Sequence, residues 1–387
     1  MGNATVSVLL TATLFALAFS LAAVRRHVPE HDLLLSLLLT IPRIGSLTRR
    51  SPLATGATIW IALSGSVAIL AGQAKPSDFL TLHGLLSIVN FSLILPIAIG
   101  VYFRFRISGE DFLRMATHSA LRLIPASSAA PRHRRWYFGE GFLMVMTLLI
   151  QASIVHSELE FGLPETVWIE RAGNHNSLND YGVIHYAIRG VLVYFGLAAF
   201  AYGFSLFYKI SHLDLNEYST LYTADYQVSR RVRALGATLL IAAFSGSISV
   251  AIQGVVLFIV VSRGGANPIV VLLQSSWLLW VFITATGTIF LAGTMHRLHE
   301  LLSEAKVQIA EGEMARLNET FNSPKATSPA DIDPATYERF LQARLHLHQM
   351  IDGIDTSPLP GGTRGFVGAA VLQLTGIIMG IAGLVRG

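Results

Sequence analysis

The chain has 387 residues, of which 52% are hydrophobic and 13% charged, with no cysteine and a formal net charge of +4. Soluble domains carry about 25% charged residues, so this composition excludes a disordered protein, a nucleic-acid-binding protein and an ordinary soluble enzyme. The absence of cysteine also excludes disulfides, iron–sulfur clusters and thiolate nucleophiles. The apolar residues occur in blocks of about 20, the length that crosses ~30 Å of hydrocarbon. We therefore expect an integral membrane protein of the all-α class, a polytopic helical bundle.

Eight such blocks are predicted to cross the membrane as helices. The first, Thr5 to Val24, has no basic residue before it and has Arg25 and Arg26 after it, which is the reverse of a secretory signal peptide. We therefore expect a retained first span whose N-terminus lies outside. The predicted spans are residues 5–24, 53–73, 79–103, 137–154, 181–208, 234–261, 268–295 and 365–384.

Basic residues in the loops test this topology independently, because cytoplasmic loops are enriched in lysine and arginine. With the N-terminus outside, the four inside segments 25–50, 104–135, 209–233 and 296–364 hold 23 of the 28 basic residues. The outside stretch 156–180 is acidic. This distribution predicts a multipass protein of the plasma membrane, of the bacterial inner-membrane type, with both termini outside.

The chain divides into three parts by position relative to the membrane. Residues 1–295 are predicted to form a bundle of seven spans with short amphipathic helices on the cytosolic side, and residues 365–387 form the final span. Residues 296–364 are predicted to form a cytosolic helical hairpin. The seventh span continues there as a polar amphipathic helix, and Pro334 suits the first position of a second helix.

A basic helix is predicted on the inner side of the third span. The residues Ser108 to Asp111 have the pattern of a capping box that opens a helix. Arg114, His118 and Arg122 then follow at four-residue intervals on one face, which is suited to anionic lipid headgroups. The alternative is a connector packed beneath the bundle.

Arg189 is the one basic residue inside a predicted span. It lies eight residues from the outer end of the fifth span, about 12 Å deep at 1.5 Å per residue. An arginine at this depth costs a few kcal/mol unless it is paired or faces water. It is predicted to bind an anion or a carboxylate in an outward-facing cavity. The alternatives are extension of the side chain to the headgroups or a structural salt bridge to Glu158 or Glu160.

Other strong hydrogen-bonding side chains share the outer half of the membrane with Arg189. Hydrocarbon would penalise each of them if it faced lipid, so we expect a shared polar vestibule open to the outside. Separate interhelical hydrogen bonds are the alternative explanation. The predicted vestibule or pore residues are Arg189, His185, His83, Gln151, Gln253, Gln274 and Asn90.

Small residues form stripes on the last three predicted spans. Gly376 and Gly380 make a close-packing face on the eighth span, and Gly246 and Gly254 do so on the sixth. Ser245 and Ser249 accompany the glycines of the sixth span, and Thr284 and Thr288 follow on the seventh. Such stripes either line a narrow polar path or allow helices to approach closely.

Motifs for catalysis and for cofactor binding are missing from the sequence. No P-loop, zinc-protease or nucleophile-elbow pattern occurs, so neither an enzyme nor a cofactor is predicted. No predicted span holds a central carboxylate, which makes a proton relay difficult to place. His83, His156, His175 and His185 lie on the outer side but lack ligand spacing, and Arg189 would oppose a cation, so no metal is predicted.

Two hypotheses for the function remain, with a weaker third. The first is a channel or transport protein whose outer vestibule admits an anion or a small polar solute. The second is a non-transporting membrane subunit, sensor or scaffold that assembles through its cytosolic hairpin and its glycine-rich last span. An intramembrane enzyme or a metal or haem protein is the third, supported only by the histidines. The expected partners are anionic lipid headgroups and either further copies of the chain or a membrane complex, with no nucleic acid.

Overall fold

A computed structural model describes residues 3–24, 45–47, 50–51, 54–55, 58, 95–118, 132–160, 169–172, 175–213, 221–223, 227–264, 277–321, 334–359 and 362–386. These residues are almost entirely helical, as the sequence predicts. The elements are α1 (Asn3–Val24), α7 (Leu95–His118), α8 (Arg132–Glu160), β1 (Ile169–Ala172), β2 (His175–Leu178), α9 (Asp180–Ser211), α10 (Arg230–Gly264), α12 (Trp277–Phe321), α13 (Pro334–Asp352) and α14 (Gly362–Arg386).

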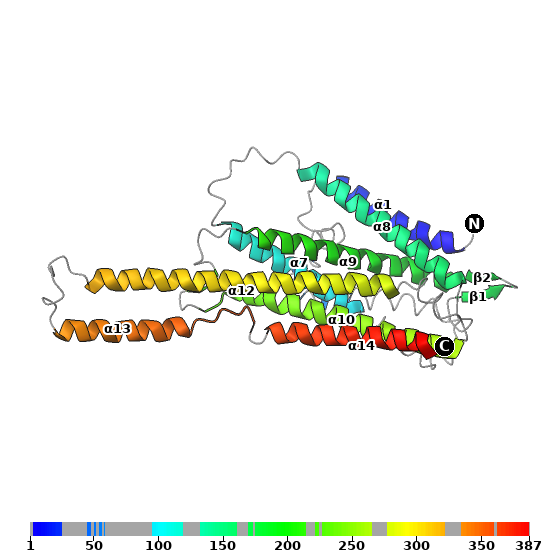
Figure 1. Ribbon diagram of the computed structural model, residues 1–387. Coiled ribbons are helices and arrows are strands. Elements are labelled where there is room, and N and C mark those ends of the chain that lie inside the picture. Colours follow the sequence, from blue (N-terminus) through cyan, green and yellow to red (C-terminus); the bar gives the residue numbers. More distant parts are fainter. Residues whose placement is uncertain are drawn as a thin grey trace.

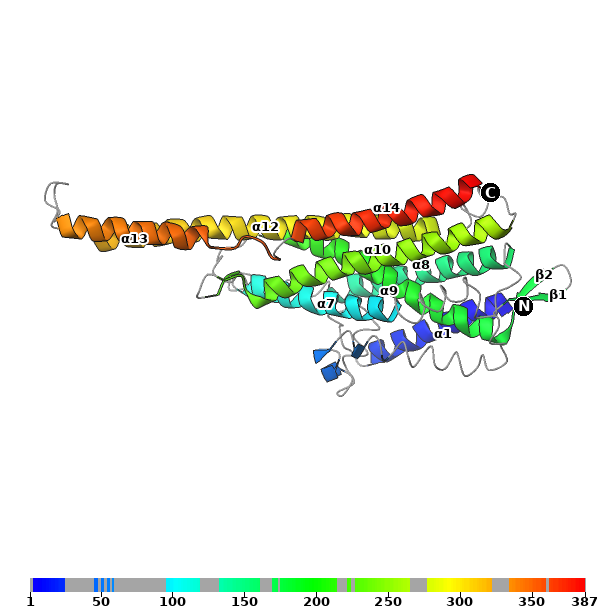
Figure 2. The same cartoon turned by 90° about the horizontal axis from the view of Figure 1, so that it is seen from below.

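The long helices lie roughly alongside one another in an elongated bundle (Figure 1). The start of α1, the strands β1 and β2, and the end of α14 lie at one end of this bundle (Figures 1 and 2). At the other end, α12 and α13 project beyond the remaining helices as a two-helix arm. One end of the molecule therefore holds the two ends of the described chain, and the other end holds the arm.

A small antiparallel sheet, which the sequence does not predict, joins α8 to α9. Ile169 pairs with Leu178, and Ala172 pairs with His175. Leu178 is buried, and its carbonyl accepts a hydrogen bond from the side chain of Asn3 on α1. Asn179 then caps α9 by accepting a hydrogen bond from the Gly182 N–H at 2.7 Å. The sheet thus connects the ends of α1, α8 and α9.

The predicted helix start at Ser108 is wrong. Helix α7 runs unbroken from Leu95 to His118, so Ser108 lies inside it. Its hydroxyl oxygen lies 3.5 Å from that of Thr238 on α10, and Phe112 is fully buried. These packing contacts at and beyond Ser108 stabilise one continuous helix. The exposed Arg114 therefore extends a long packed helix and does not belong to a separate surface helix.

Within the described part of the chain, three helical stretches are long and apolar enough to cross a membrane: Gly139–His156, Gly182–Ser211 and Arg230–Ile252. Large apolar side chains on the helices point outward, among them Leu17, Leu149, Phe282, Ile289 and Ile378. Polar side chains such as Thr11, Gln151 and Gln373 are buried. This inverted distribution suits a lipid surrounding, and together with the apolar lengths it indicates a membrane protein.

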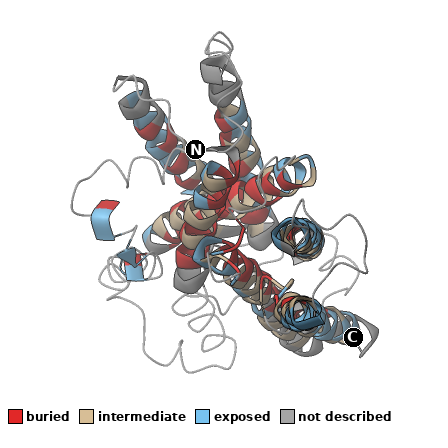
Figure 3. Cartoon of the chain, turned by 90° about the vertical axis from the view of Figure 1, so that its left-hand side faces the viewer, coloured by how far each residue is buried: buried red, intermediate tan, exposed pale blue. Residues whose placement is uncertain are grey.

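Helix α9 occupies the middle of the bundle, in contact with α1, α7, α8 and α12. One apolar cluster lies between α9, α1, α7 and α8, and includes Phe15, Phe103 and Met144. A second cluster lies between α9, α7, α10, α12 and α14. Viewed from the end that carries the arm, buried residues concentrate toward the centre of the bundle (Figure 3). Helices α9 and α7 therefore contribute to both clusters.

Candidate functional site

A cavity of about 210 Å³ lies between α7, α9, α10 and α12. Much of its wall is aromatic or aliphatic, including Tyr102, Phe105 and Phe195. Besides Tyr102, hydroxyl side chains on the wall come from Ser245 and Ser249 on α10 and from Thr284 and Thr288 on α12. The small-residue stripes that the sequence identifies on these two helices therefore line the same cavity, and Gly246 and Gly287 lie beside their hydroxyls. This volume is much larger than a single water molecule requires.

Helix α9 places two of the predicted residues on the same face as the cavity. His185, Arg189, Leu192 and Gly196 are spaced at i, i+4, i+7 and i+11, which is one face of a helix. Leu192 and Gly196 line the cavity, whereas His185 and Arg189 lie one to two turns nearer the end that carries the termini. Along α9, His185 and Arg189 therefore precede the cavity-lining positions on the side of the termini.

The side chain of Arg189 is only partly buried. Its guanidinium carbon lies 5.8 Å from the centroid of the Tyr186 ring, within the range of a cation–π interaction. His185 is buried with 8% exposure, and its ring meets that of Tyr186 edge-on at 5.3 Å. The ring of Tyr186 thus lies against both side chains.

Gln253 lies on the same sequence stripe of α10 as the serines of the cavity. It follows Ser245 and Ser249 at i+8 and i+4, so its helical position is one turn beyond the cavity wall. His83, Asn90 and Gln274 lie outside the described residues, as does Arg122.

Gln151 lies in a different place, away from the cavity. Its side chain is 2% exposed and is packed between α1, α8 and α9. Its Nε2 donates to Thr11 Oγ1 and to the Tyr186 carbonyl, both at 2.9 Å, and lies 3.5 Å from Ser7 Oγ. These hydrogen bonds correspond to the interhelical alternative for this residue, so Gln151 and the cavity belong to opposite sides of α9.

The predicted packing glycines lie at tight helix contacts. A Cβ atom added to Gly254 would lie 2.1 Å from the Gly376 carbonyl oxygen, and one added to Gly376 would lie 2.6 Å from Ala251 Cα. A Cβ added to Gly246 would lie 2.8 Å from Thr284 Cγ2. Gly380 is buried on α14. Close approach of α14 to α10, and of α12 to α10, depends on these positions having no side chain.

Comparison of the chain with protein-family models, with curated proteins and with solved structures gives no match.

The structure also contains a buried carboxylate that the sequence reasoning missed. Glu140 on α8 is 7% exposed and accepts a hydrogen bond from the Tyr194 hydroxyl at 2.6 Å. Glu140, Met144, Thr147 and Gln151 are spaced at i, i+4, i+7 and i+11, and all four are buried. This spacing was the signal that could have placed Glu140 on the inward face of its helix.

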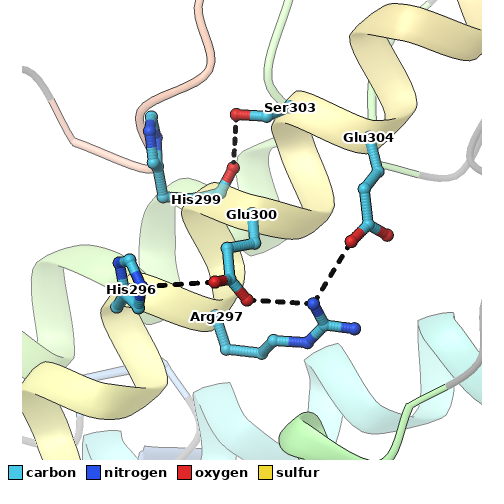
Figure 4. Close-up of polar contacts among 6 residues, drawn as sticks. All are labelled: His296, Arg297, His299, Glu300, Ser303 and Glu304. Carbon is cyan, nitrogen blue, oxygen red and sulfur yellow. Dashed lines mark hydrogen bonds and ion pairs between the residues drawn. The ribbon is translucent and has the colours of Figure 1, made fainter.

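At the base of the arm, α12 carries a network of polar contacts along its own surface and one contact to the segment that follows α13. Figure 4 shows Arg297 Nη1 donating to Glu300 at 2.9 Å and to Glu304 at 3.3 Å, with His296 3.2 Å from Glu300 on its other side. The hydrogen bond from Arg297 holds the pKa of the Glu300 carboxyl below its usual range, and the same bond raises the pKa of Arg297. His299 Nδ1 donates to the Thr356 carbonyl at 2.7 Å.

The segment between α13 and α14 is fixed through consecutive backbone carbonyls. Lys306 Nζ donates to the Ile354 carbonyl at 3.3 Å. The Tyr222 hydroxyl lies 3.0 Å from the Asp355 carbonyl oxygen and 2.9 Å from that of Leu302. Burial raises the pKa of the Tyr222 hydroxyl above its usual value, so it stays a neutral donor. These contacts attach the arm to the bundle at its base.

Among the residues that the structure describes, no three His, Asp or Glu side chains are grouped in a way that would hold a metal ion. His185 is separated by sequence and helix from the other described histidines.

Proposed function

We propose that this protein is a multipass channel or transport protein that carries a small anion or a small polar solute. The observation that supports this most directly is the cavity between α7, α9, α10 and α12, with Arg189 on the same face of α9. A cation at the approach would attract an anion. The hydroxyl groups of Ser245 and Thr284 would then replace part of its hydration inside the bundle. The Thr288 hydroxyl donates to the Thr284 carbonyl at 2.9 Å and accepts from Gln373 Nε2 at 2.7 Å, so it serves the packing of α12 against α14.

The proposed topology has eight spans, with both termini outside and the arm of α12 and α13 in the cytosol, in a plasma membrane of the bacterial inner-membrane type. The arrangement of the ends supports it, since both ends of the described chain lie together and the arm lies opposite (Figure 1). The enrichment of basic residues in the segments assigned to the inside supports the same orientation.

Filling the cavity tests the proposed path. In Ala199→Phe, the new ring projects from a position on the cavity wall. The matched control is Ala370→Phe on α14, which adds the same ring to an exposed position. With purified protein in liposomes and chloride, nitrate and glycerol as probes, Ala199→Phe should reduce flux at least about tenfold, and Ala370→Phe should leave it near the wild-type value.

Arg189→Gln tests the choice of an anion. The substitution removes the charge while keeping a side chain that can form hydrogen bonds, so it should lower chloride and nitrate flux and leave glycerol flux unchanged. Wild-type liposomes that show no more flux of any probe than empty liposomes would refute the proposed function. Flux that persists in Ala199→Phe would refute the cavity as its path.

A second candidate function, assembly of a complex, is favoured by an apolar stripe on the arm. Tyr337, Leu341 and Leu345 follow at four-residue intervals on α13, and each is at least 45% exposed. A stripe of this kind on a helix in water suits contact with another helix. If the chain self-associates through it, Leu341→Glu together with Leu345→Glu should reduce the mass of the detergent-solubilised protein to that of one chain.

A further inference from the structure

The cavity between α7, α9, α10 and α12 has a neutral wall. Among the described residues that line it, every one is aliphatic, aromatic, a glycine, a serine or a threonine. Burying an ion against such a wall costs far more free energy than burying a neutral molecule. A molecule that is held in this cavity should therefore be neutral.

The cavity is long and narrow. Its lining on α9 runs from Leu192 to Gly203, about 16 Å along the helix at 1.5 Å per residue. Its volume of about 210 Å³ is larger than the volume of an engineered apolar cavity, about 150 Å³, that binds benzene. A molecule that fills a space of this length needs an extended apolar body, as a linear alkyl chain has. Each methylene group that is buried there should strengthen binding about fourfold.

Two hydroxyl side chains lie close together on the wall. Ser245 is next to Gly246, and a Cβ atom added to Gly246 would lie 2.8 Å from Thr284 Cγ2. The structure shows no hydrogen bond from either hydroxyl to a described residue, whereas the Thr288 hydroxyl accepts from Gln373 at 2.7 Å. A hydroxyl group on a bound molecule can both donate and accept a hydrogen bond, so it suits this pair.

The part of the wall nearer the arm is apolar. Leu291 follows Thr284 by about two turns of α12 toward the arm. On α10, Ala242 precedes Ser245 by about one turn. Ala199 on α9 also lines the cavity, two turns beyond Leu192 in the direction of the arm. The cavity thus offers hydrogen bonds at one level and apolar contacts along the rest of its length.

We propose that this cavity is a binding site for a linear aliphatic alcohol of medium chain length. Its hydroxyl group would lie between Ser245 and Thr284, and its alkyl chain would lie along the apolar wall. This ligand goes beyond the proposed function, in which the same cavity is a path for solutes. The tail of a bilayer lipid has no group for the two hydroxyls, because the polar groups of a lipid stay outside the hydrocarbon layer.

Photolabelling with octanol that carries a diazirine on its third carbon tests binding without any transport assay. In purified wild-type protein, mass spectrometry should locate adducts on residues of the cavity wall, and excess n-octanol should remove them. Adducts on exposed side chains such as Phe282 and Ile289 should persist, because these positions face the surrounding lipid or detergent. Adducts that occur only on exposed residues, or that excess octanol leaves unchanged, would overturn the proposal.

Variants test the two parts of the site separately. Ala199→Phe fills the apolar part of the cavity and should lose the octanol-sensitive adducts, whereas the matched control Ala370→Phe, at an exposed position of α14, should keep them. Ser245→Ala combined with Thr284→Val removes both hydroxyls with little change in side-chain size. This double variant should need at least about fivefold more octanol for competition, as expected for the loss of two hydrogen bonds. An unchanged competition curve would refute the alcohol as the ligand, even if Ala199→Phe does not fold.

Obstruction of the path by a bound alcohol rests on the proposed function and has its own readout. In liposomes, octanol at the concentration that removes the adducts should reduce wild-type flux of chloride or nitrate, and the double variant should be less sensitive. If flux persists while the site is occupied, the binding site stands and the cavity is refuted as the path. If no probe moves at all, the transport function fails, and photolabelling still decides whether the alcohol binds.

Discussion

Replacing Gly376 by alanine should separate α14 from α10. The most extensive contact between described helices joins these two, and its closest point is at Gly376 and Gly254. The new methyl carbon of Gly376→Ala would lie 2.6 Å from Ala251 Cα, 2.9 Å from Ala251 N and 3.0 Å from the Val250 carbonyl oxygen. All three neighbours are backbone atoms, so no side chain can rotate away to make room.

The magnitude follows from the distances. Ordinary van der Waals contact begins at 3.4 Å, so the helices must move apart by close to 1 Å along the contact. Overpacking of this kind costs about 1–3 kcal/mol, and the rigid neighbours place the expected loss toward 3 kcal/mol. Alanine is otherwise the better helix former by about 1 kcal/mol, which offsets part of this cost.

The assay is unfolding of the purified protein in detergent, followed by tryptophan fluorescence. Gly376→Ala should lower the free energy of unfolding by about 2 kcal/mol after that offset. The matched control is Gly141→Ala on α8, where an added Cβ has no neighbour within 4 Å, and it should leave stability unchanged or raise it. If both variants unfold at the wild-type midpoint, close packing at Gly376 does not stabilise this bundle and the reasoning is refuted.

Three further predictions concern buried and surface hydrogen bonds. Gln151→Leu should lower the free energy of unfolding by about 1–2 kcal/mol, the range of interhelical hydrogen bonds in membranes, whereas an unchanged denaturation curve would show that its amide contributes nothing. Tyr222→Phe should speed hydrogen exchange at residues 353–359, because the Asp355 carbonyl loses its donor; exchange equal to the wild type would contradict this attachment of the arm. The folded-state pKa of Glu300 is lowered by Arg297, so its stabilisation is present above the ordinary carboxyl pKa and is lost as the pH falls through the lowered value. Circular dichroism of wild type and Arg297→Gln across this acidic range should show a small difference in helix content that vanishes at the lowest pH, and a constant difference would be contrary evidence.

Much of the helix plan can be predicted from hydropathy and from local signals. The predicted fifth span, residues 181–208, lies within α9, and Pro334 begins α13. Local capping signals give a wrong helix boundary where tertiary packing favours a continuous helix. The sequence around Ser108 satisfies a capping pattern, yet α7 continues through it because Phe112 is buried in the same bundle. Helix boundaries follow the sequence only where tertiary contacts agree with it.

The candidate site likewise has features that the sequence predicts and features that only the tertiary structure shows. The stripe of Ser245 and Ser249 and that of Thr284 and Thr288 can be read directly from their spacing. Their meeting at one cavity depends on how α10 and α12 are rotated, and hydropathy contains no information about this rotation. Gln151 has a predicted depth similar to that of the other predicted vestibule residues, but its hydrogen bonds join α8 to α1 and to α9, away from the cavity.

The low charge content of 13% and its segregation by segment determined by themselves that this chain is helical and suited to a membrane, because hydrocarbon penalises exposed charge and unpaired backbone irrespective of the fold. The tertiary structure decided which side chains meet. A carboxylate near the start of one apolar stretch is unremarkable in sequence, but the crossing of α8 and α9 brings Glu140 to Tyr194 in the interior. Depth in a bundle depends on tilt and on neighbouring helices, and these are set by side-chain packing between segments far apart in the chain.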